Sequence, residues 1–234
     1  MRKMLRFDEL DSTNAYAKRN CSLIENQTII VAKTQSAGRG RLSRSWLSEP
    51  GGLYFSVVLK PTQITHLANL TQLMALSVCQ VLRELGVAAQ LKWPNDVLVN
   101  DKKICGILSE AVTSENKFDA LVLGVGVNIA QTDLSRAGQP AVSLAMLGIN
   151  YDAEKMLQQI LDRFFAQYEN VLQNGFSAIR TDYLNYFPYI GKEVIIAHGT
   201  TPTRGTVQTI SPVGELILNT PAGQTVISIG DMCI

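Results

Sequence analysis

TIIVAKTQSAGRGRLSRSWLSEPGGLYFSVVLK occupies residues 28–60 and decides how the first half of the chain folds. Its first segment, 28–34, is rich in β-branched residues and predicts a buried strand. Its last segment, 53–60, predicts a second strand, which Pro61 closes. Between them, glycine and serine make 35–46 a poor helix and a poor strand. The stretch therefore predicts two strands joined by a long loop.

The loop at 35–46 concentrates positive charge. It carries Arg39, Arg41 and Arg44, and no Asp or Glu lies between the start of the loop and Glu49. Guanidinium groups offer fixed forks of donors to phosphate, and glycine lets backbone amides approach an anion closely. Taken alone, the loop fits a polyanion site and a solvated basic turn about equally well. The other motifs of the chain decide between the two.

Composition limits the classes of function. The chain has 234 residues, 46% of them hydrophobic and 18% charged, with a net charge of +1. Without a global basic field, non-specific binding of nucleic acid is not expected. The four cysteines are scattered, which argues against a zinc site or a disulfide framework and fits a reducing cytosol. Neither a signal peptide nor a membrane span is read. We expect a cytoplasmic protein that binds neither DNA nor membranes.

Hydrophobic periodicity predicts helices and further strands around this loop. Apolar spacings of three and four predict one long helix over 67–85 and a second over 153–174. Asp152 is the expected N-cap of the second helix and Gly175 its end. Shorter helices are expected over 15–19 and 176–186, and further strands over 4–9, 89–92, 96–99, 103–112 and 120–129. The pattern predicts an α+β fold: a mixed, mostly antiparallel sheet with helices on one face.

The character of the chain changes at Pro188. Beyond it, short β segments are separated by Gly, Pro and Thr turns; they cover 193–197, 205–210, 216–219 and 225–229. These segments predict a small β-barrel or sandwich. We therefore expect two domains, residues 1–187 and residues 188–234.

The motif KWPND at 92–96 lies between two predicted strands. Its simpler interpretation is a rigid turn, because Pro, Asn and Asp are good turn formers. The functional interpretation is that Asn95 and Asp96 direct polar groups into a cleft, with Lys92 nearby.

The motif KICGIL at 103–108 opens an apolar strand with Lys103, which either extends to solvent or meets a carboxylate in a pocket. Gly106 weakens this strand unless something approaches its backbone closely. Cys105 is expected to be a packed strand residue, since no histidine or basic cluster is at hand to activate it. The sequence GVGVN at 124–128 is not a dinucleotide fingerprint, and the chain has no P-loop.

Together these motifs resemble the biotin protein ligases, also called biotin–[acetyl-CoA-carboxylase] ligases or holocarboxylase synthetases. The resemblance rests on STN at 12–14, TQSAGRGRLSRSW at 34–46, KWPND, KICGIL and GVGVN, in matching order and spacing, and it covers essentially the whole chain. It implies a class II synthetase-like catalytic domain followed by an SH3-like C-terminal domain. The sequence is similar to the group that lacks an N-terminal helix-turn-helix.

The resemblance implies a two-step reaction. The biotin carboxylate attacks the α-phosphate of Mg·ATP and gives biotinyl-5′-AMP and pyrophosphate. A lysine of a biotin carboxyl carrier protein, the carrier of acetyl-CoA carboxylase, then attacks the acyl-adenylate and releases AMP. ATP and Mg²⁺ are the implied cofactors, and biotin is the implied substrate. Some relatives form homodimers, and this sequence allows one.

The resemblance also implies a set of site residues. Those implied to bind biotin are Ser12, Thr13, Asn14, Gln35, Gly38, Arg39, Gly40, Arg41, Lys103 and Gly106. Those implied to bind ATP or the adenylate are Arg41, Arg44, Trp46, Lys92, Asn95 and Asn128. The implied catalytic residues are Lys103, Arg39, Arg41 and Asp96, with Asp96 also the candidate Mg²⁺ ligand.

One position departs from the family pattern. Relatives commonly read GRGRxGRxW, and Ser43 stands at the second glycine of that pattern. A positive φ there would strain the serine by about 1 kcal/mol.

Two alternatives remain. A lipoate ligase or octanoyltransferase shares the architecture, and an octanoyltransferase needs an activated Cys or Lys nucleophile. A biotin sensor without ligase activity would not need a clamp for a triphosphate. The arginine loop favours the ligase over both alternatives.

Overall fold

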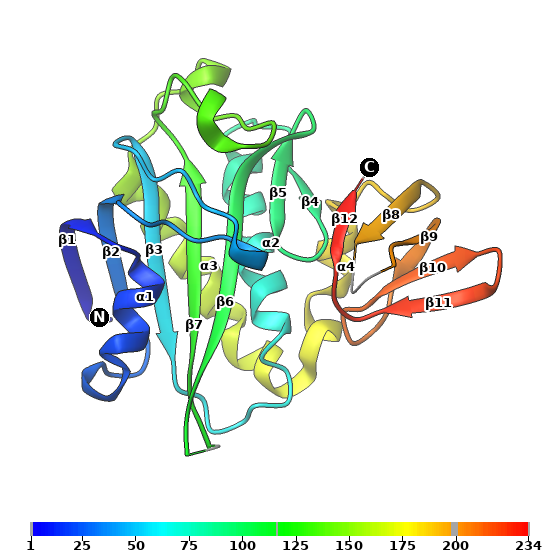
Figure 1. Cartoon of the computed structure of the whole chain (residues 1–234), viewed down its shortest axis with the longest axis horizontal. Coiled ribbons are helices and arrows are strands. Elements are labelled where there is room, and N and C mark those ends of the chain that lie inside the picture. Colours follow the sequence, from blue (N-terminus) through cyan, green and yellow to red (C-terminus); the bar gives the residue numbers. More distant parts are fainter. Residues whose placement is uncertain (1, 116, 198–200, 234) are drawn as a thin grey trace.

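The computed structural model describes residues 2–115, 117–197 and 201–233, which form two sheets lying side by side (Figure 1). The larger sheet has the order β1-β2-β3-β7-β6-β5-β4. Its strands are β1 (Met4–Leu10), β2 (Thr28–Gln35), β3 (Gly52–Leu59), β4 (Gln90–Lys92), β5 (Asp96–Val99), β6 (Lys102–Ser114) and β7 (Lys117–Asn128). Only β1 and β2 run parallel; the other neighbours in this sheet are antiparallel. The predicted α+β fold with a mixed, mostly antiparallel sheet is confirmed.

Two long helices cover one face of the larger sheet. They are α2 (Asn69–Glu84) and α3 (Ala153–Asn174), and both lie behind the sheet in Figure 1. Successive side chains of a strand point to opposite faces, so Phe55, Val57 and Val125 share this helical side and belong to the main core. As the sequence predicts, α3 begins after the Asp152 side chain, which accepts from the backbone amide of Lys155, and it ends at Gly175. No helix in the described ranges is long and apolar enough to span a membrane.

The opposite face carries α1 (Thr13–Arg19) in addition to the helices expected on one face only. Ala17 of α1 packs with Ile30, Val58 and Val122 in a smaller cluster of buried residues. The even-numbered positions of β3, β6 and β7 therefore face α1 and the space beside it. That space, uncovered by any long helix, is the place in this fold where a ligand can reach the sheet.

Short helical turns connect the main elements. They lie at Cys21–Leu23, Arg41–Ser43, Ser135–Ala137, Ala145–Leu147 and Gly175–Ala178. The single helix expected over 176–186 is divided into the last of these turns and α4 (Arg180–Asn185).

The C-terminal segment forms a five-stranded antiparallel sheet in the order β11-β10-β9-β8-β12. Its strands are β8 (Glu193–Ala197), β9 (Thr203–Ile210), β10 (Leu216–Thr220), β11 (Gly223–Ile227) and β12 (Asp231–Cys233). Among the described residues, β11 and β12 are not paired with each other, so the expected barrel is not closed. The predicted β segments are present, and β12 is a strand that the sequence did not predict.

Three side chains of the main body fasten this sheet in place. Gln72 Nε2 and Trp93 Nε1 donate to the carbonyl oxygen of Gly214, at 2.8 and 3.0 Å. Asn69 Nδ2 donates to the carbonyl oxygen of Val213 at 3.0 Å. Because the turn between β9 and β10 is held at these points, β12 keeps a fixed place beside the larger sheet.

Candidate active site

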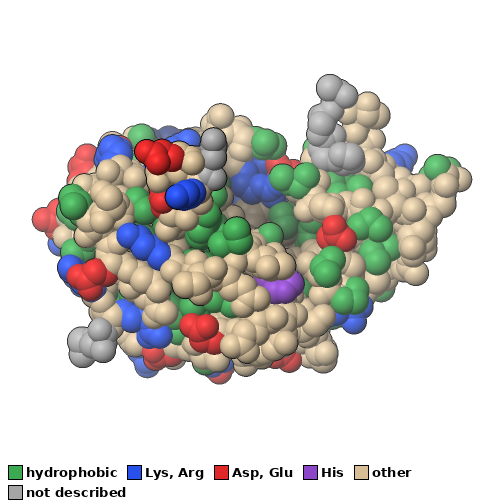
Figure 2. All heavy atoms as spheres, turned by 90° about the horizontal axis from the view of Figure 1, so that it is seen from below, with side chains coloured by type: hydrophobic (Ala, Val, Ile, Leu, Met, Phe, Trp, Pro, Cys, Tyr) green, Lys and Arg blue, Asp and Glu red, His purple; other side chains and the backbone are tan. Residues whose placement is uncertain are grey.

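A cavity of about 220 Å³ opens on the α1 face of the larger sheet. It lies between that face and β12, and Figure 2 shows a hollow at this place with Lys or Arg side chains on its wall. Three glycines form part of its floor: Gly106 and Gly126 are paired across β6 and β7, and Gly124 lies two residues away.

These glycines are required by what lies on them. A Cβ atom at Gly126 would come within 2.3 Å of Trp46 Nε1, and one at Gly124 would come within 2.2 Å of Asn14 Oδ1. From the sequence, GVGVN was only excluded as a dinucleotide fingerprint. The structure shows that its glycines leave room for the indole and amide side chains that line the cavity.

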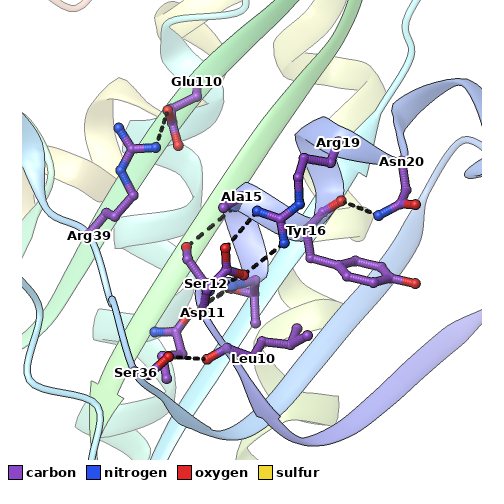
Figure 3. Close-up of polar contacts among 12 residues, drawn as sticks. Leu10, Asp11, Ser12, Ala15, Tyr16, Arg19, Asn20, Ser36, Arg39 and Glu110 are labelled. Atoms are coloured by element: carbon purple, nitrogen blue, oxygen red, sulfur yellow. Dashed lines mark hydrogen bonds and ion pairs between the residues drawn. The ribbon is translucent and has the colours of Figure 1, made fainter.

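One end of the cavity is lined mainly by hydroxyl and amide side chains and is called the polar end here. It is formed where β1 runs into α1 and where β2 ends. Ser12 caps α1, its Oγ accepting from the amide of Ala15 at 3.4 Å (Figure 3). Gln35 Oε1 accepts from the Thr13 amide at 2.8 Å, and Gln35 Nε2 donates to Ser48 Oγ at 2.8 Å. These bonds leave Ser12 and Thr13 hydroxyl groups on the cavity wall.

Glu110 on β6 supports this polar end from the side. Its carboxylate accepts from Lys18 Nζ at 2.7 Å and from Asn14 Nδ2 at 3.0 Å. The guanidinium of Arg39 lies 3.8 Å away (Figure 3). Burial raises the pKa of the Glu110 carboxyl, but the bonds from Lys18 and Asn14 outweigh it, and the net pKa lies below the ordinary value.

The other end of the cavity is strongly charged. Lys103 Nζ lies 2.7 Å from Asp96 Oδ1 and 5.4 Å from the centre of the Trp46 ring. Across β5 and β6, Asp96 pairs with Gly106, which brings the KWPND and KICGIL motifs together. Lys92 also lines the cavity and pairs with no carboxylate among the residues that the structure describes.

The arginine loop crosses the cavity and meets β12. Arg41 donates to Asn95 Oδ1 at 3.0 Å and lies 3.1 Å from Asp231 Oδ1. Arg44 lies 2.7 Å from Asp231 Oδ2. Asp231 is therefore held between two arginines, at the place where the resemblance implies phosphate binding.

The turn at Arg41–Ser43 has an unusual backbone. Leu42 and Ser43 have φ values of +51° and +60°, in the left-handed region that favours glycine. The positive φ on which the predicted strain at Ser43 depended is present.

The cavity brings together most of the residues that the sequence implied. They are Ser12, Thr13, Asn14, Gln35, Arg39, Gly40, Arg41, Arg44, Trp46, Lys92, Asn95, Asp96, Lys103 and Gly106. Arg39, which the resemblance implied to be catalytic, lies beside Glu110 at the polar end of the cavity.

Gly38 and Asn128 are not on the cavity wall. A Cβ at Gly38 would meet the carbonyl oxygen of Trp46 at 2.4 Å, so this glycine lets the two arms of the loop approach each other. Asn128 Nδ2 donates to the carbonyl oxygens of Lys103 and Val142, at 3.3 and 3.2 Å. It fixes the backbone that carries Lys103.

Sequence reasoning missed several residues that build the site. Ser56, Glu110 and Asp231 belong to no motif that drew notice, and Asp231 lies 135 positions from Asp96 along the chain. The alternation of side chains along a strand could have identified Glu110, because residues 106 and 110 of β6 point to the same face of the sheet. No local signal marks Asp231, since its role depends on how the two sheets are placed.

The described residues support neither a nucleophilic cysteine nor a metal site made by protein side chains alone. Cys105 is fully buried, and burial raises the pKa of its thiol far above the ordinary value, so it is no nucleophile. In the described part of the chain, no three His, Cys, Asp or Glu side chains gather to hold a metal ion.

Comparison with known families matches both parts of the chain. Residues 6–128 match the Biotin/lipoate A/B protein ligase family, and residues 189–233 match the Biotin protein ligase C terminal domain.

Individual curated proteins are also similar to this chain. The chain is 34% identical over 232 residues to the biotin–[acetyl-CoA-carboxylase] ligase of Paracoccus denitrificans, covering 93% of this chain and 94% of that protein. It is 33% identical over 203 residues to the bifunctional ligase/repressor BirA of Bacillus subtilis, covering 84% of this chain but only 62% of that longer protein.

A solved structure shares the fold over the full length. Biotin protein ligase from Aquifex aeolicus, in complex with biotin and ATP, superposes with a TM-score of 0.89 at 30% identity and covers 100% of this chain and 98% of its own. The chain therefore belongs to the Biotin/lipoate A/B protein ligase family, and within it to the biotin protein ligases.

Proposed function

We propose that this protein activates biotin with ATP to biotinyl-5′-AMP and transfers the biotinyl group to a lysine of a biotin carboxyl carrier protein. The observation that carries the proposal is the gathering of Lys103, Arg41 and Arg44 at one end of a cavity whose other end is lined mainly by hydroxyl and amide side chains. A carboxylate and a triphosphate repel each other, and fixed cations offset that repulsion in the transition state.

The polar end would take the ureido ring of biotin. A cyclic urea has one carbonyl acceptor and two N–H donors, and Ser12, Thr13 and Gln35 offer both kinds of partner. Trp46 lies over the glycines of the floor and supplies apolar surface for the thiophane ring and valeryl chain. Gly40 and Gly106 allow backbone to approach the ligand closely.

The charged end would hold the reacting groups. Lys103 and Arg41 would flank the biotin carboxylate and the α-phosphate, and Arg44 the outer phosphates. Asn95, fixed by its bond to the carbonyl oxygen of Ile107 at 2.8 Å, would bind the nucleotide beside Lys92. Arg39 would act at the ureido end, where its partner is Glu110. Asn128 would act through the Lys103 backbone.

Asp96 fits a magnesium ion that arrives with the nucleotide. It lines the cavity, and one carboxylate with phosphate oxygens and water is a typical Mg²⁺ environment, whereas a protein-only cage would need more ligands. When bound, the ion supplies charge neutralisation at the phosphates. Asp96 is its proposed ligand.

In the first step, a carboxylate oxygen of biotin forms a bond to the α-phosphorus and pyrophosphate leaves. In the second step, the amine of the carrier lysine forms an amide bond with the acyl carbon, and AMP leaves with the electron pair of the broken C–O bond. The proton of the attacking amine needs an acceptor, and the proposed one is Asp96, whose carboxylate lies 2.7 Å from Lys103.

We also propose that residues 1–187 are the catalytic unit and that residues 188–234 contribute to it through Asp231. The cytoplasm is the proposed location.

A biotin-dependent exchange assay tests activation. Purified protein should exchange labelled pyrophosphate into ATP when biotin is present, and lipoate in place of biotin should give no exchange. Exchange with lipoate but not with biotin would favour the lipoate ligase. Binding of biotin without any exchange would favour a sensor.

A further inference from the structure

Ser56 on β3 lies beneath the polar end of the cavity without lining it. It is fully buried, and its Oγ lies 2.7 Å from Thr13 Oγ1 and 2.6 Å from Asn14 Oδ1. Thr13 and Asn14 both line the cavity, whereas Ser56 does not. Ser56 is thus the group on which two side chains of the candidate ureido site rest.

The orientation of the Asn14 amide follows from its surroundings. Asn14 Nδ2 faces the carbonyl oxygen of Leu108 at 3.2 Å and Glu110 Oε2 at 3.0 Å, and both can only accept. The oxygen of the Asn14 amide therefore faces Ser56 and accepts a proton from it. Gly124 makes room for this arrangement, because the Cβ atom of any other residue there would overlap Asn14 Oδ1.

The single proton of Ser56 is committed to Asn14, which decides the direction of the neighbouring bond. Two groups of the protein can then accept the Thr13 proton: Ser56 Oγ at 2.7 Å and Gln35 Oε1 at 3.2 Å. The contact with Ser56 is the shorter of the two, and either one turns the proton away from the cavity. With its proton turned inward, the Thr13 oxygen presents only lone pairs to the cavity.

Ser12 has the opposite polarity. Its Oγ accepts from the Ala15 amide at 3.4 Å, and none of its contacts in the described ranges uses its proton. The wall therefore offers a donor at Ser12 and an acceptor at Thr13. A cyclic urea needs this combination, one donor for its carbonyl and one acceptor for an N–H.

We propose that Ser56 is a positioning residue that holds the Thr13 hydroxyl as an acceptor for a ureido N–H of the substrate. This inference rests on the proposed function. It also supplies a reason for selectivity, because the dithiolane ring of lipoate has no N–H and would leave the Thr13 acceptor unpaired. A site built to pair a polar group discriminates strongly against an analogue that lacks it.

The test compares biotin binding by Ser56→Ala and by Ser77→Ala. Ser77 is an equally buried serine whose Oγ donates to the carbonyl oxygen of Leu73 at 2.9 Å within α2. Calorimetric titration should show the Kd for biotin raised about tenfold in Ser56→Ala and unchanged in Ser77→Ala. Steady-state kinetics should show that the KM for ATP is unchanged in both variants. Ser56→Cys, which keeps a weak donor in nearly the same volume, should fall between Ser56→Ala and the unmodified protein.

A double-mutant cycle identifies the path of the effect. Thr13→Val removes the proposed acceptor, so adding Ser56→Ala to it should raise the Kd by less than about threefold. A full tenfold effect in both backgrounds, or an unchanged Kd in folded Ser56→Ala, would overturn the inference. If the unmodified protein did not bind biotin, the proposed function itself would fall, which is a different result from either of these.

Discussion

Asp231 Oδ1 lies 3.1 Å from the guanidinium of Arg41, and this contact joins the last strand of the C-terminal sheet to the arginine loop of the main body. The other oxygen of the same carboxylate lies 2.7 Å from Arg44. Both arginines are proposed to bind phosphates. In the absence of nucleotide, the Asp231 carboxylate therefore binds the guanidinium groups that are proposed to bind the phosphates.

Asp231→Asn should lower the KM for ATP. The amide keeps the shape of the carboxylate but removes the charge that competes with the phosphates. From the strength of a partly buried ion pair, we expect the KM for ATP to fall by about two- to fivefold. Steady-state pyrophosphate release at saturating biotin measures it. The matched control is Glu193→Gln, which removes the ion pair with Arg204 in the same sheet at 3.0 Å. A raised KM in Asp231→Asn would mean that Asp231 positions the arginines for phosphate instead of competing with it.

Ser43→Gly should stabilise the ligand-free protein. Glycine adopts the φ of +60° without the steric cost that serine has, although its greater freedom in the unfolded chain offsets part of the gain. The net increase in the free energy of unfolding should be positive and below about 1 kcal/mol, measured by urea denaturation. Ser45→Gly in the same loop, where φ is not positive, should be destabilising; equal effects of the two changes would contradict the strain at Ser43.

Lys103→Ala should nearly abolish activation of biotin. The change removes a cation from the reacting end and leaves the Asp96 carboxylate without the partner that lies 2.7 Å away. We expect the rate of biotin-dependent pyrophosphate exchange to fall by about 10²–10³-fold. The exposed neighbour Lys102 provides the control, and Lys102→Ala should keep the full rate. A rate within a factor of about three of the unmodified protein would remove Lys103 from the reaction.

Glu110→Gln should change how stability depends on pH. The folded-state pKa of Glu110 lies below its ordinary value, so the carboxylate contributes stability above that value, and this contribution is lost as the pH falls through the folded-state pKa. The difference in unfolding free energy between the unmodified protein and Glu110→Gln should therefore be largest near neutrality and shrink as the pH falls below the ordinary pKa of a glutamate carboxyl, about 4.3. Denaturation across this range measures it. Glu169→Gln, at an exposed position of α3, should give a small difference that does not vary in this way.

The sequence predicted those elements that local signals define. The helix over Ala153–Asn174 has a side-chain cap at one end and a glycine at the other, and both boundaries were predicted correctly. The turn at Asn100 and Asp101, with φ values of +49° and +60°, joins β5 and β6, the strands expected over 96–99 and 103–112. Such signals act within a few residues and are visible in a single sequence.

Features that depend on tertiary placement were beyond the reach of the sequence. The parallel pairing of β1 with β2 and the position of α1 on the far face of the sheet follow from how α1 packs across the strands. Likewise, Ser56 and Asp231 matter because of neighbours far away along the chain, Asn14 for one and Arg41 for the other. No spacing rule connects residues of this kind.

Transfer of biotin to a carrier domain tests the proposed function most directly. The protein is incubated with biotin, Mg·ATP and a purified biotin carboxyl carrier domain, and the carrier is examined by intact-mass and peptide mass spectrometry. The predicted result is one biotinyl group on one lysine of the carrier, absent when ATP or biotin is omitted. An unmodified carrier in the complete mixture, under conditions where an established biotin protein ligase modifies the same carrier, would contradict it.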